Sequence, residues 1–327
     1  MNEVGFLRFE PYFKRVLWGG QRIRPFKGLT PDDEPIGESW EISGLEGYES
    51  VVAEGKFNGQ RIDELLGQFG KEILGERLYR IFGNKFPILV KFIDASKDLS
   101  IQVHPDDRLA RARHSCWGKT ELWYTISSDT GSYIYSGLLE SITPQQLKEH
   151  VANNTLSSVL AKFYPNKGDL FYLPAGRIHS IGAGNLILEI QQTSDITYRV
   201  YDYDRTDING KKRELHTELA LDAIDYRVHE DYMRHITPIS DREIVMKECP
   251  FFSATLLTLT RSHRIKVARY DSFRVVIAVS GEGVLTDDSG NQIKIRQGET
   301  VLVPASAKWF EAKPMSMQFD LVTAYIQ

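Results

Sequence analysis

The sequence predicts a mainly β protein with flanking helical segments, and two kinds of observation support this class. Residues 86–93 form an almost entirely apolar run of strand length, and shorter apolar runs bounded by Gly, Pro and Asp surround Ile101, Leu122 and Leu170. In the C-terminal part of the chain, residues 287–291 (Asp-Asp-Ser-Gly-Asn) are typical of a hairpin turn between two strands. Many short strands at this spacing indicate barrels or sandwiches.

Three stretches are expected to form the helices that flank or bridge these strands. Residues 61–82 carry apolar side chains at close to a helical period, interrupted by three glycines. Thr143 begins a capping box, with Pro at the first helical position and Gln146 at the third, and this helix should reach toward residue 163. A third helical candidate runs from about residue 215 to residue 233.

Length and charge restrict the class of protein. A chain of 327 residues can bury a large core and is long enough for two structural units. The formal net charge of −4 gives no general attraction to nucleic acid or to anionic membranes, so an anionic ligand needs a local basic cluster. There is no apolar run of the ~20 residues needed to span a bilayer, and residues 1–4 do not begin a signal peptide. We therefore expect a cytoplasmic protein.

Three segments far apart in the chain offer ligands to one divalent metal. Gln102 and His104 are two positions apart in a predicted strand, so their side chains face the same way. Glu121 precedes Leu, Trp and Tyr in a run that should be buried, where a carboxylate needs a cationic partner. With His179 these residues provide two imidazoles, a carboxylate and an amide, which is the ligand chemistry of a catalytic zinc-type site. For Gln102, a hydrogen-bonded core side chain is the competing interpretation.

Residues 168–179 follow the pattern Gly, five residues, Pro, one residue, Gly, two residues, His. This spacing matches the second metal motif of cupin β-barrels, in which a turn at Pro-x-Gly aims the His into the barrel. Residues 298–304 repeat the first half of the pattern, but Ser306 replaces the second Gly and Trp309 replaces the His. The repeat should therefore form a second cupin that holds no metal.

The whole chain thus resembles a double cupin, two jelly-roll β-barrels with flanking helical segments. Residues 1–240 are expected to form an N-terminal catalytic cupin with helical insertions, and residues 241–327 a C-terminal metal-free cupin. The first cupin motif usually reads His-x-His with a Glu shortly after, whereas here Gln102 replaces the first His and the Glu lies 17 residues beyond His104.

With these departures the chain resembles type I phosphomannose isomerase in its short bacterial form. The segments that carry the resemblance occur in the family's order over the first two thirds of the chain: residues 18–20 (WGG), 37–43 (GESWEIS), 99–107 (LSIQVHPDD), 118–124 (GKTELWY), 174–179 (PAGRIH) and 194–199 (SDITYR). The resemblance implies a metal-dependent interconversion of D-mannose 6-phosphate and D-fructose 6-phosphate through a cis-enediol. It also implies one zinc ion per chain, although the ligand types would equally suit manganese, iron or cobalt.

The resemblance further implies catalytic roles for several side chains. Arg199 stands at the position of the family's essential arginine, and Lys119 at that of a lysine that lines the active site. Proton transfer between C1 and C2 requires a general base, and Lys119, Glu189 and Asp195 are all candidates among which the sequence does not choose.

Two further residues are expected to bind the phosphate. Arg205 corresponds to a basic residue that helps to hold phosphate, and an arginine can bind phosphate oxygens with two donors. Ser100 could donate its hydroxyl. From the residues alone, Arg205 could instead pair with Asp202 or Asp204, and Ser100 could bond to the backbone.

Two other functions fit a cupin with this ligand set. Cupins host dioxygenases as well as isomerases, and a binding protein could keep the pocket as a sugar-phosphate sensor without turnover. The presence of Lys119 and Arg199 beside all the metal candidates argues against the sensor, because binding alone has no chemical need for the full set.

Overall fold

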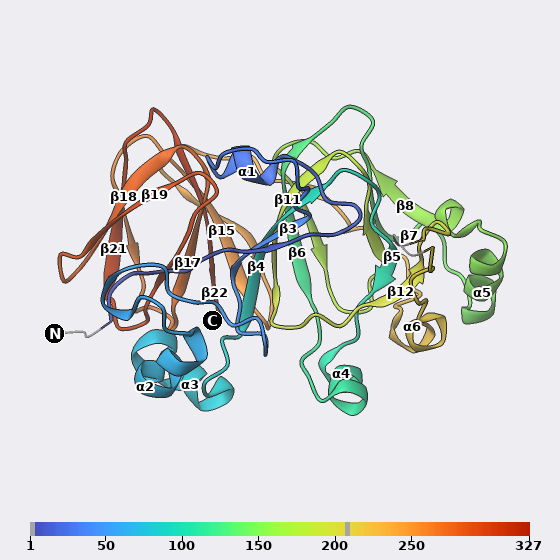
Figure 1. Ribbon diagram of the computed structural model, residues 1–327, viewed down its shortest axis with the longest axis horizontal. Helices are drawn as coiled ribbons and strands as arrows, with labels where there is room; N and C mark the ends of the chain where they lie inside the picture. Colours follow the sequence, from blue (N-terminus) through green and yellow to red (C-terminus); the bar gives the residue numbers. More distant parts are fainter. Residues whose placement is uncertain (1–3, 207–209) are drawn as a thin grey trace.

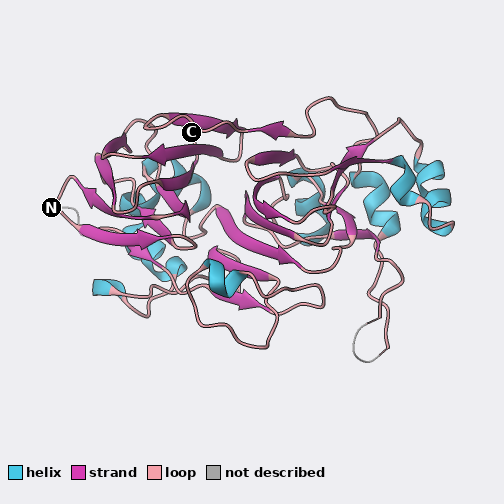
Figure 2. Ribbon diagram, turned by 90° about the horizontal axis from the view of Figure 1, so that it is seen from above, coloured by secondary structure: helices cyan, strands magenta, loops and turns pink. Residues whose placement is uncertain are grey.

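The computed structural model describes residues 4–206 and 210–327 and shows two β-rich units side by side (Figure 1). Strands are the main regular secondary structure of both units (Figure 2). The prediction of a mainly β protein is therefore confirmed. The strands form four separate sheets that pack in pairs, and these sheets do not close into barrels. No helix in the described ranges is long and apolar enough to cross a membrane.

The N-terminal unit contains a seven-stranded and a five-stranded antiparallel sheet. The seven-stranded sheet has the order β13 (Arg234–His235), β9 (Asp169–Leu173), β6 (Glu121–Ser128), β11 (Asn185–Gln192), β4 (Ile88–Ala95), β3 (Glu38–Ile42) and β2 (Tyr12–Lys14). The five-stranded sheet has the order β12 (Tyr198–Tyr201), β5 (Ile101–Val103), β10 (His179–Ile181), β7 (Ile134–Leu138) and β8 (Leu160–Phe163). β4 is buried along its whole length, as predicted for the apolar run at residues 86–93.

The C-terminal unit pairs a six-stranded with a four-stranded sheet. The first has the order β1 (Leu7–Arg8), β20 (Thr300–Val303), β17 (Arg274–Ser280), β22 (Phe319–Tyr325), β15 (Ser253–Leu259) and β14 (Glu243–Glu248). The second has the order β16 (His263–Lys266), β21 (Trp309–Pro314), β18 (Glu282–Asp287) and β19 (Gln292–Arg296). β18 and β19 pair across the predicted hairpin turn, which confirms that prediction.

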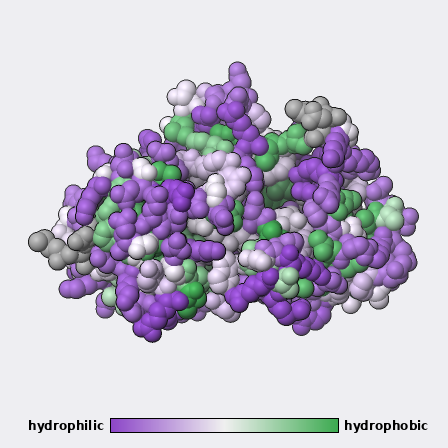
Figure 3. All heavy atoms as spheres, turned by 60° about the horizontal axis from the view of Figure 1, so that its bottom comes forward, coloured by the Kyte–Doolittle hydropathy of each residue, from purple (hydrophilic) through white to green (hydrophobic). Residues whose placement is uncertain are grey.

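Separate apolar cores lie on the two faces of these sheets. One core fills the space between the sheets of the C-terminal unit, and another lies between the two N-terminal sheets. The largest core joins the outer face of the six-stranded sheet to that of the seven-stranded sheet and to the helices beneath them. Both units therefore share buried surface, which holds their relative position. The face of the molecule that Figure 3 shows is covered mainly by hydrophilic side chains.

The helices lie outside the sheets, and their ends follow from local sequence. α2 (Ile62–Leu74) and α3 (Glu76–Phe82) fill the predicted helical stretch, separated at Gly75, whose φ of 93° interrupts the helix. α5 (Pro144–Ala152) begins with the predicted capping box: the Thr143 side chain accepts from the Gln146 N–H, and the Gln146 side chain accepts from the Thr143 N–H. The remaining helices are α1 (Ile23–Phe26), α4 (Asp107–His114), α6 (Thr217–Ala223) and the 3₁₀ turns η1 (Gly55–Phe57) and η2 (Leu156–Val159).

Two helices are shorter than the sequence predicted. α5 was expected to reach residue 163, but the chain enters η2 and then β8, which pairs with β7. The third candidate forms helix only over α6, because Ile224 is extended and the Asp225 N–H donates to the Gly176 carbonyl at 2.8 Å. In both cases a partner distant in sequence takes the backbone out of the helix.

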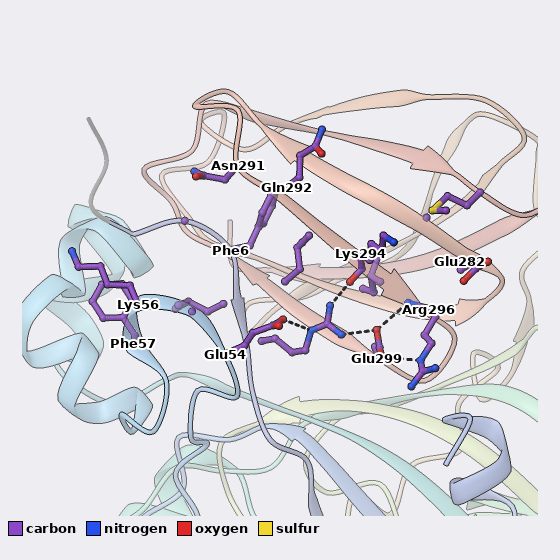
Figure 4. Close-up of a pocket in the computed structure, with 18 residues that line it drawn as sticks. Phe6, Glu54, Lys56, Phe57, Glu282, Asn291, Gln292, Lys294, Arg296 and Glu299 are labelled. Atoms are coloured by element: carbon purple, nitrogen blue, oxygen red, sulfur yellow. Dashed lines mark hydrogen bonds and ion pairs between the residues drawn. The ribbon is translucent and has the colours of Figure 1, made fainter. Parts of the chain in front are cut away.

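The first strand belongs to the C-terminal sheet, because β1 pairs with β20. Arg8 fixes it there through Glu54, Lys294 and Glu299, which Figure 4 shows around the same pocket. Arg8 Nη1 donates to Glu299 at 2.7 Å, Nε lies 3.0 Å from Glu54, and Nη2 donates to the Lys294 carbonyl. A cavity of about 1060 Å³ lies beside this contact.

A buried ion pair provides a second connection between the units. The Lys27 ammonium lies 2.7 and 2.8 Å from the two oxygens of Glu41 and also donates to the Gly298 carbonyl of the C-terminal unit. The side chains of Lys27 and Glu41 are 6% and 4% exposed. Removal of one partner of such a pair leaves an uncompensated buried charge.

We therefore expect Lys27→Met to lower the free energy of unfolding by about 3 to 5 kcal/mol. Lys27→Met combined with Glu41→Leu should regain much of this loss, because two apolar side chains leave no charge unpaired. Chemical denaturation followed by fluorescence checks both results. Lys148→Met, which removes an exposed ion pair with Glu218, is the matched control and should leave stability almost unchanged. A Lys27→Met protein as stable as the control would contradict the role assigned to the pair.

Candidate active site

Strand register brings three of the predicted site residues into one row on the five-stranded sheet. His179 on β10 stands opposite Gln102 on β5, and Gln102 stands opposite Arg199 on β12. Directly opposed residues of antiparallel strands project from the same face, so these side chains enter one space. The turn before His179 depends on Gly176, whose φ is 93° and whose N–H donates to the His104 carbonyl at 2.9 Å. That bond ties the two metal motifs together.

A second row faces it from the seven-stranded sheet. Lys91 on β4 stands opposite Trp40 on β3 and Glu189 on β11, and Glu189 stands opposite Trp123 on β6. All four side chains are buried. The site is therefore built between two sheets, and each sheet contributes a row of side chains.

His104, Glu121 and His179 come together as the sequence predicted. Their ligand atoms lie within 4.8 Å of one another, and all three residues are buried. His179 Nε2 is 3.2 Å from Glu121 Oε1, and His104 Nε2 is 3.5 Å from Oε2. Gln102 also reaches this cluster, since its amide nitrogen lies 3.5 Å from His179 Nε2. Within the described residues, this is the one group of three or more His, Cys, Asp or Glu side chains with metal-ligand spacing.

Both imidazoles carry their proton on the nitrogen that faces away from the cluster, which leaves the other nitrogen free to bind a cation. His104 Nδ1 donates to the Ile196 carbonyl at 2.8 Å, and His179 Nδ1 donates to the Arg177 carbonyl at 2.7 Å. Because a carbonyl can only accept, both protons sit on Nδ1, and the Nε2 lone pairs point into the cluster. Burial lowers the pKa of His179 to about 3 and that of His104 well below its usual value, and the Lys119 ammonium lowers both further. Both rings are neutral at pH 7.

The carboxylate of Glu121 is short of partners without a metal. Neither oxygen accepts a hydrogen bond of good geometry from a described residue, although the Lys119 ammonium lies 3.0 Å from Oε2. Burial raises the pKa of Glu121 to about 7, and Lys119 opposes the rise. A buried, under-satisfied carboxylate between two neutral imidazole nitrogens fits a divalent cation. The residues present therefore fit the metal that the sequence predicted.

Lys119 lies beside this cluster. Its ammonium is 3.1 Å from His104 Nε2, so its side chain points the same way as that of Glu121. β6 begins at Glu121, so Lys119 lies in the loop before it.

Lys91 joins two buried carboxylates beside the metal cluster. Its ammonium lies 3.3 Å from Glu189 and 3.5 Å from Glu38. Trp123 Nε1 donates to Glu189, and Trp40 Nε1 donates to Glu38, each at 2.7 Å. Burial alone would raise the pKa of Glu189, but Lys91 and Lys119 outweigh it and hold this pKa below its usual value. Glu189 therefore stays ionised although it is fully buried.

A cavity of about 380 Å³ opens onto these groups. Six residues that the sequence assigned to the site line it: Ser100, Gln102, Lys119, Glu189, Asp195 and Arg199. His104, Glu121 and His179 do not line the cavity themselves. They lie behind two residues that do, Lys119 and Gln102, and contact them. The volume is within the range of small-molecule sites.

The predicted residues occupy different depths of this cavity. The Ser100 hydroxyl donates to the Gln102 side chain at 3.3 Å. Asp195 is 41% exposed at the rim, where its carboxylate lies 3.5 Å from the Lys14 ammonium. Arg199 Nη1 donates to the Glu214 carbonyl at 2.8 Å, and its buried Nε makes no hydrogen bond to a described residue.

Arg205 does not line this cavity. Its guanidinium bonds to the Asp202 side chain and to the Asp98 carbonyl. Arg213 bonds to the same Asp202, with Nε donating at 2.7 Å, and does line the cavity next to Arg199. The two arginines thus share one carboxylate, and Arg213 is the one that faces the space a ligand would fill.

The sequence analysis missed Lys91, Glu38 and Arg213. Lys91 is a single cation in the apolar run at residues 86–93, and a buried cation usually has a partner, so this signal was available. Glu38 offered a weaker signal, as an acidic residue next to the buried Trp40. Arg213 gave none, because only folding places it beside Arg199.

Comparisons with known proteins agree with this geometry. A family model described as phosphomannose isomerase type I, catalytic domain, matches residues 6–120. The chain is 35% identical over 321 residues to a mannose-6-phosphate isomerase of Streptococcus mutans, covering 98% of this chain and 96% of that protein. It is 34% identical over 302 residues to the mannose-6-phosphate isomerase ManA of Bacillus subtilis, covering 91% and 92%. A crystal structure of the mannose 6-phosphate isomerase from Bacillus subtilis matches with a TM-score of 0.85 at 29% identity, over 99% of this chain and all of that one. The chain belongs to the type I phosphomannose isomerase family.

Proposed function

We propose that this protein is a metal-dependent isomerase that interconverts D-mannose 6-phosphate and D-fructose 6-phosphate through a cis-enediol. One observation carries the proposal. Two neutral imidazoles and a carboxylate lie together, in contact with charged residues that line a cavity of about 380 Å³. The relatives described above are named for this activity. A sensor would not need buried ionised side chains at the cavity floor. The family model that matches the chain describes isomerases rather than dioxygenases.

We propose that His104, Glu121, His179 and Gln102 hold one zinc ion. When bound, the ion would supply Lewis-acid polarisation of the sugar's carbonyl or hydroxyl oxygens. The family resemblance favours zinc, since the ligand types alone would equally suit manganese, iron or cobalt.

The proton must leave C2 of the aldose and arrive at C1, and we propose Lys119, Glu189 and Asp195 for this transfer. Lys119 and Glu189 line the cavity from positions that are 4% and 2% exposed, whereas Asp195 stands at the rim. Transfer between adjacent carbons is protected from loss to bulk water at the buried positions. Arg199 would stabilise the negative charge that develops on the enediol oxygens.

We propose that the phosphate lies near Arg199 and Arg213, with Ser100 donating its hydroxyl. These three residues line the same cavity, and two guanidinium groups give the fork geometry that suits phosphate oxygens. Arg205 remains a predicted phosphate-binding residue. It does not contact Arg213 through a bond of its own, but both arginines donate to the Asp202 carboxylate. Binding the phosphate away from the reacting carbons would orient the sugar.

The finer fold assignment is also a proposal. Each unit packs two antiparallel sheets around an apolar core, which supports a double cupin of two jelly rolls. We propose residues 1–240 as the catalytic unit and residues 241–327 as the metal-free unit, with β1 crossing to the second. The aromatic Trp309 begins β21 as His179 begins β10, and it has no metal-binding atom. We further propose that the enzyme acts in the cytoplasm on a small sugar phosphate.

Metal removal is the first test of this function. Turnover of mannose 6-phosphate should disappear after chelation and return on addition of zinc, because Glu121 and the two imidazoles then regain their shared cation. A coupled assay of fructose 6-phosphate formation measures it. Turnover that persists in protein shown by mass spectrometry to be metal-free would contradict the proposed role of the cluster.

Substitutions should separate metal binding from catalysis. Glu121→Gln and His179→Ala should lose both bound metal and turnover, whereas Arg199→Ala should keep the metal and lose turnover by roughly a hundredfold or more. Metal content and kcat are measured on the same preparations. His150→Ala, a histidine in α5 far from the cluster in the fold, is the control and should change neither. Near-normal turnover in Arg199→Ala would refute its assigned role.

Two arginines can be compared for phosphate recognition. Arg213→Ala should raise KM for mannose 6-phosphate by roughly tenfold or more, since a charge-assisted bond contributes about 1.5 to 3 kcal/mol. Arg205→Ala should have a smaller effect, because its side chain is directed to Asp202 and the Asp98 carbonyl. Steady-state kinetics of both variants check the order. A larger effect of Arg205→Ala would place the phosphate nearer to that residue.

A further inference from the structure

A separate cavity lies in the C-terminal unit between β14 and β16, the edge strands of its two sheets. Its volume is about 460 Å³. Its charged lining residues are the cations Arg264, Lys266, Arg269 and Arg274 and the carboxylates Glu243 and Glu248. The lining therefore carries two more positive than negative charges, in a protein whose formal net charge is −4.

Arg274 forms the floor of this cavity. Residues two apart on a strand share a face, so on β17 Arg274 projects from the same face as Val276 and Ala278. These two residues belong to the core between the two sheets, so the Arg274 side chain enters from the inner face. Its side chain is 5% exposed. A buried guanidinium is costly unless its donors are satisfied. This position therefore needs an explanation from its partners.

The partners of Arg274 use only part of its donor set. Nη1 lies 3.0 Å from Glu243 Oε1 and donates to the Thr323 hydroxyl at 2.8 Å, and the guanidinium carbon lies 3.7 Å from the centre of the Tyr325 ring. A guanidinium has five N–H donors. Both hydrogen bonds use Nη1, so the other two guanidinium nitrogens can donate to a ligand at the cavity floor.

The rim adds two cations, Lys266 and Arg269, that no described carboxylate neutralises. Arg264 lies over the Trp309 ring and 3.8 Å from Glu311, but Lys266 and Arg269 form no ion pair with any described residue. Of the two carboxylates, Glu248 accepts from the Gln327 amide at 2.8 Å, outside the lining, whereas Glu243 accepts from Thr255 and Arg274 within it. The excess positive charge thus faces the open space.

We propose that this cavity binds a small phosphate ester, with Arg274 at the floor and Lys266 and Arg269 at the rim contacting the phosphate oxygens. A phosphate monoester carries close to two negative charges at pH 7, which matches the excess charge of the lining. The volume exceeds that of a phosphate ion, and Tyr270 and Tyr325, whose rings stack on each other, add apolar lining beside the cations. The lining contains no His or Cys, so binding rather than metal chemistry is assigned.

Hydrogen–deuterium exchange of the full-length protein with glycerol 3-phosphate as the probe tests this site. Peptides covering β14 and β16 report on this cavity, and peptides covering residues 100–121 report separately on the isomerase site. We expect slower exchange at β14 and β16 in the wild type. Lys266→Ala with Arg269→Ala should weaken the apparent affinity at least tenfold while leaving turnover of mannose 6-phosphate unchanged. Lys308→Ala with Lys313→Ala removes the same charge outside the cavity and should bind like the wild type.

Three arms decide the outcome. Glycerol alone should have no effect, and inorganic phosphate should bind at least tenfold more weakly than the ester. Absence of slowed exchange at β14 and β16, or equal slowing in the Lys266/Arg269 double variant, would overturn the site. Equal affinity for inorganic phosphate would overturn the assignment to an ester. Because the two sites are read from different peptides, failure here leaves the isomerase proposal unaffected, and loss of turnover after chelation does not bear on this cavity.

Discussion

Pairing of ionised side chains in the interior of the N-terminal unit is the constraint on which the site depends. Glu38, Glu121 and Glu189 are all buried, and each has a lysine nearby: Lys91 between the first and third, Lys119 beside the second. Isolated buried charges would be too costly to keep, so the carboxylates and ammonium groups must fold together. The charged wall of the cavity follows directly from this requirement.

Antiparallel register is the device that arranges these groups. Lys91, Glu189 and Trp123 are cross-strand neighbours on one sheet, and His179, Gln102 and Arg199 are cross-strand neighbours on the other. A slip of one residue in any of these pairings would turn the side chains to the opposite face. The apolar core between the two sheets keeps them at a fixed separation and so holds both rows in place.

The C-terminal unit uses the same sheet pairing for a different purpose. Its inner face is mostly apolar, and a charged opening lies at the sheet edges, where Arg274 pairs with Glu243. It also supports the N-terminal unit through the large shared core, through Arg8 on β1 and through the contact of Lys27 with Gly298. Substitution of the histidine by Trp309 in the repeated motif is consistent with this supporting role.

Local pattern determined much of this protein. The spacing of glycine, proline and histidine predicted where His179 would be aimed, the Thr143 capping box predicted the start of α5, and the turn at residues 287–291 predicted the hairpin. The metal candidates were found because each lies in a short segment with its own signal. Tertiary structure decided the rest. The length of α6, the partner of Lys91 and the position of Arg213 beside Arg199 in the cavity depend on groups tens of residues away. Periodicity and turn chemistry act between near neighbours in the chain, whereas a buried charge is satisfied by whichever residue the fold places beside it.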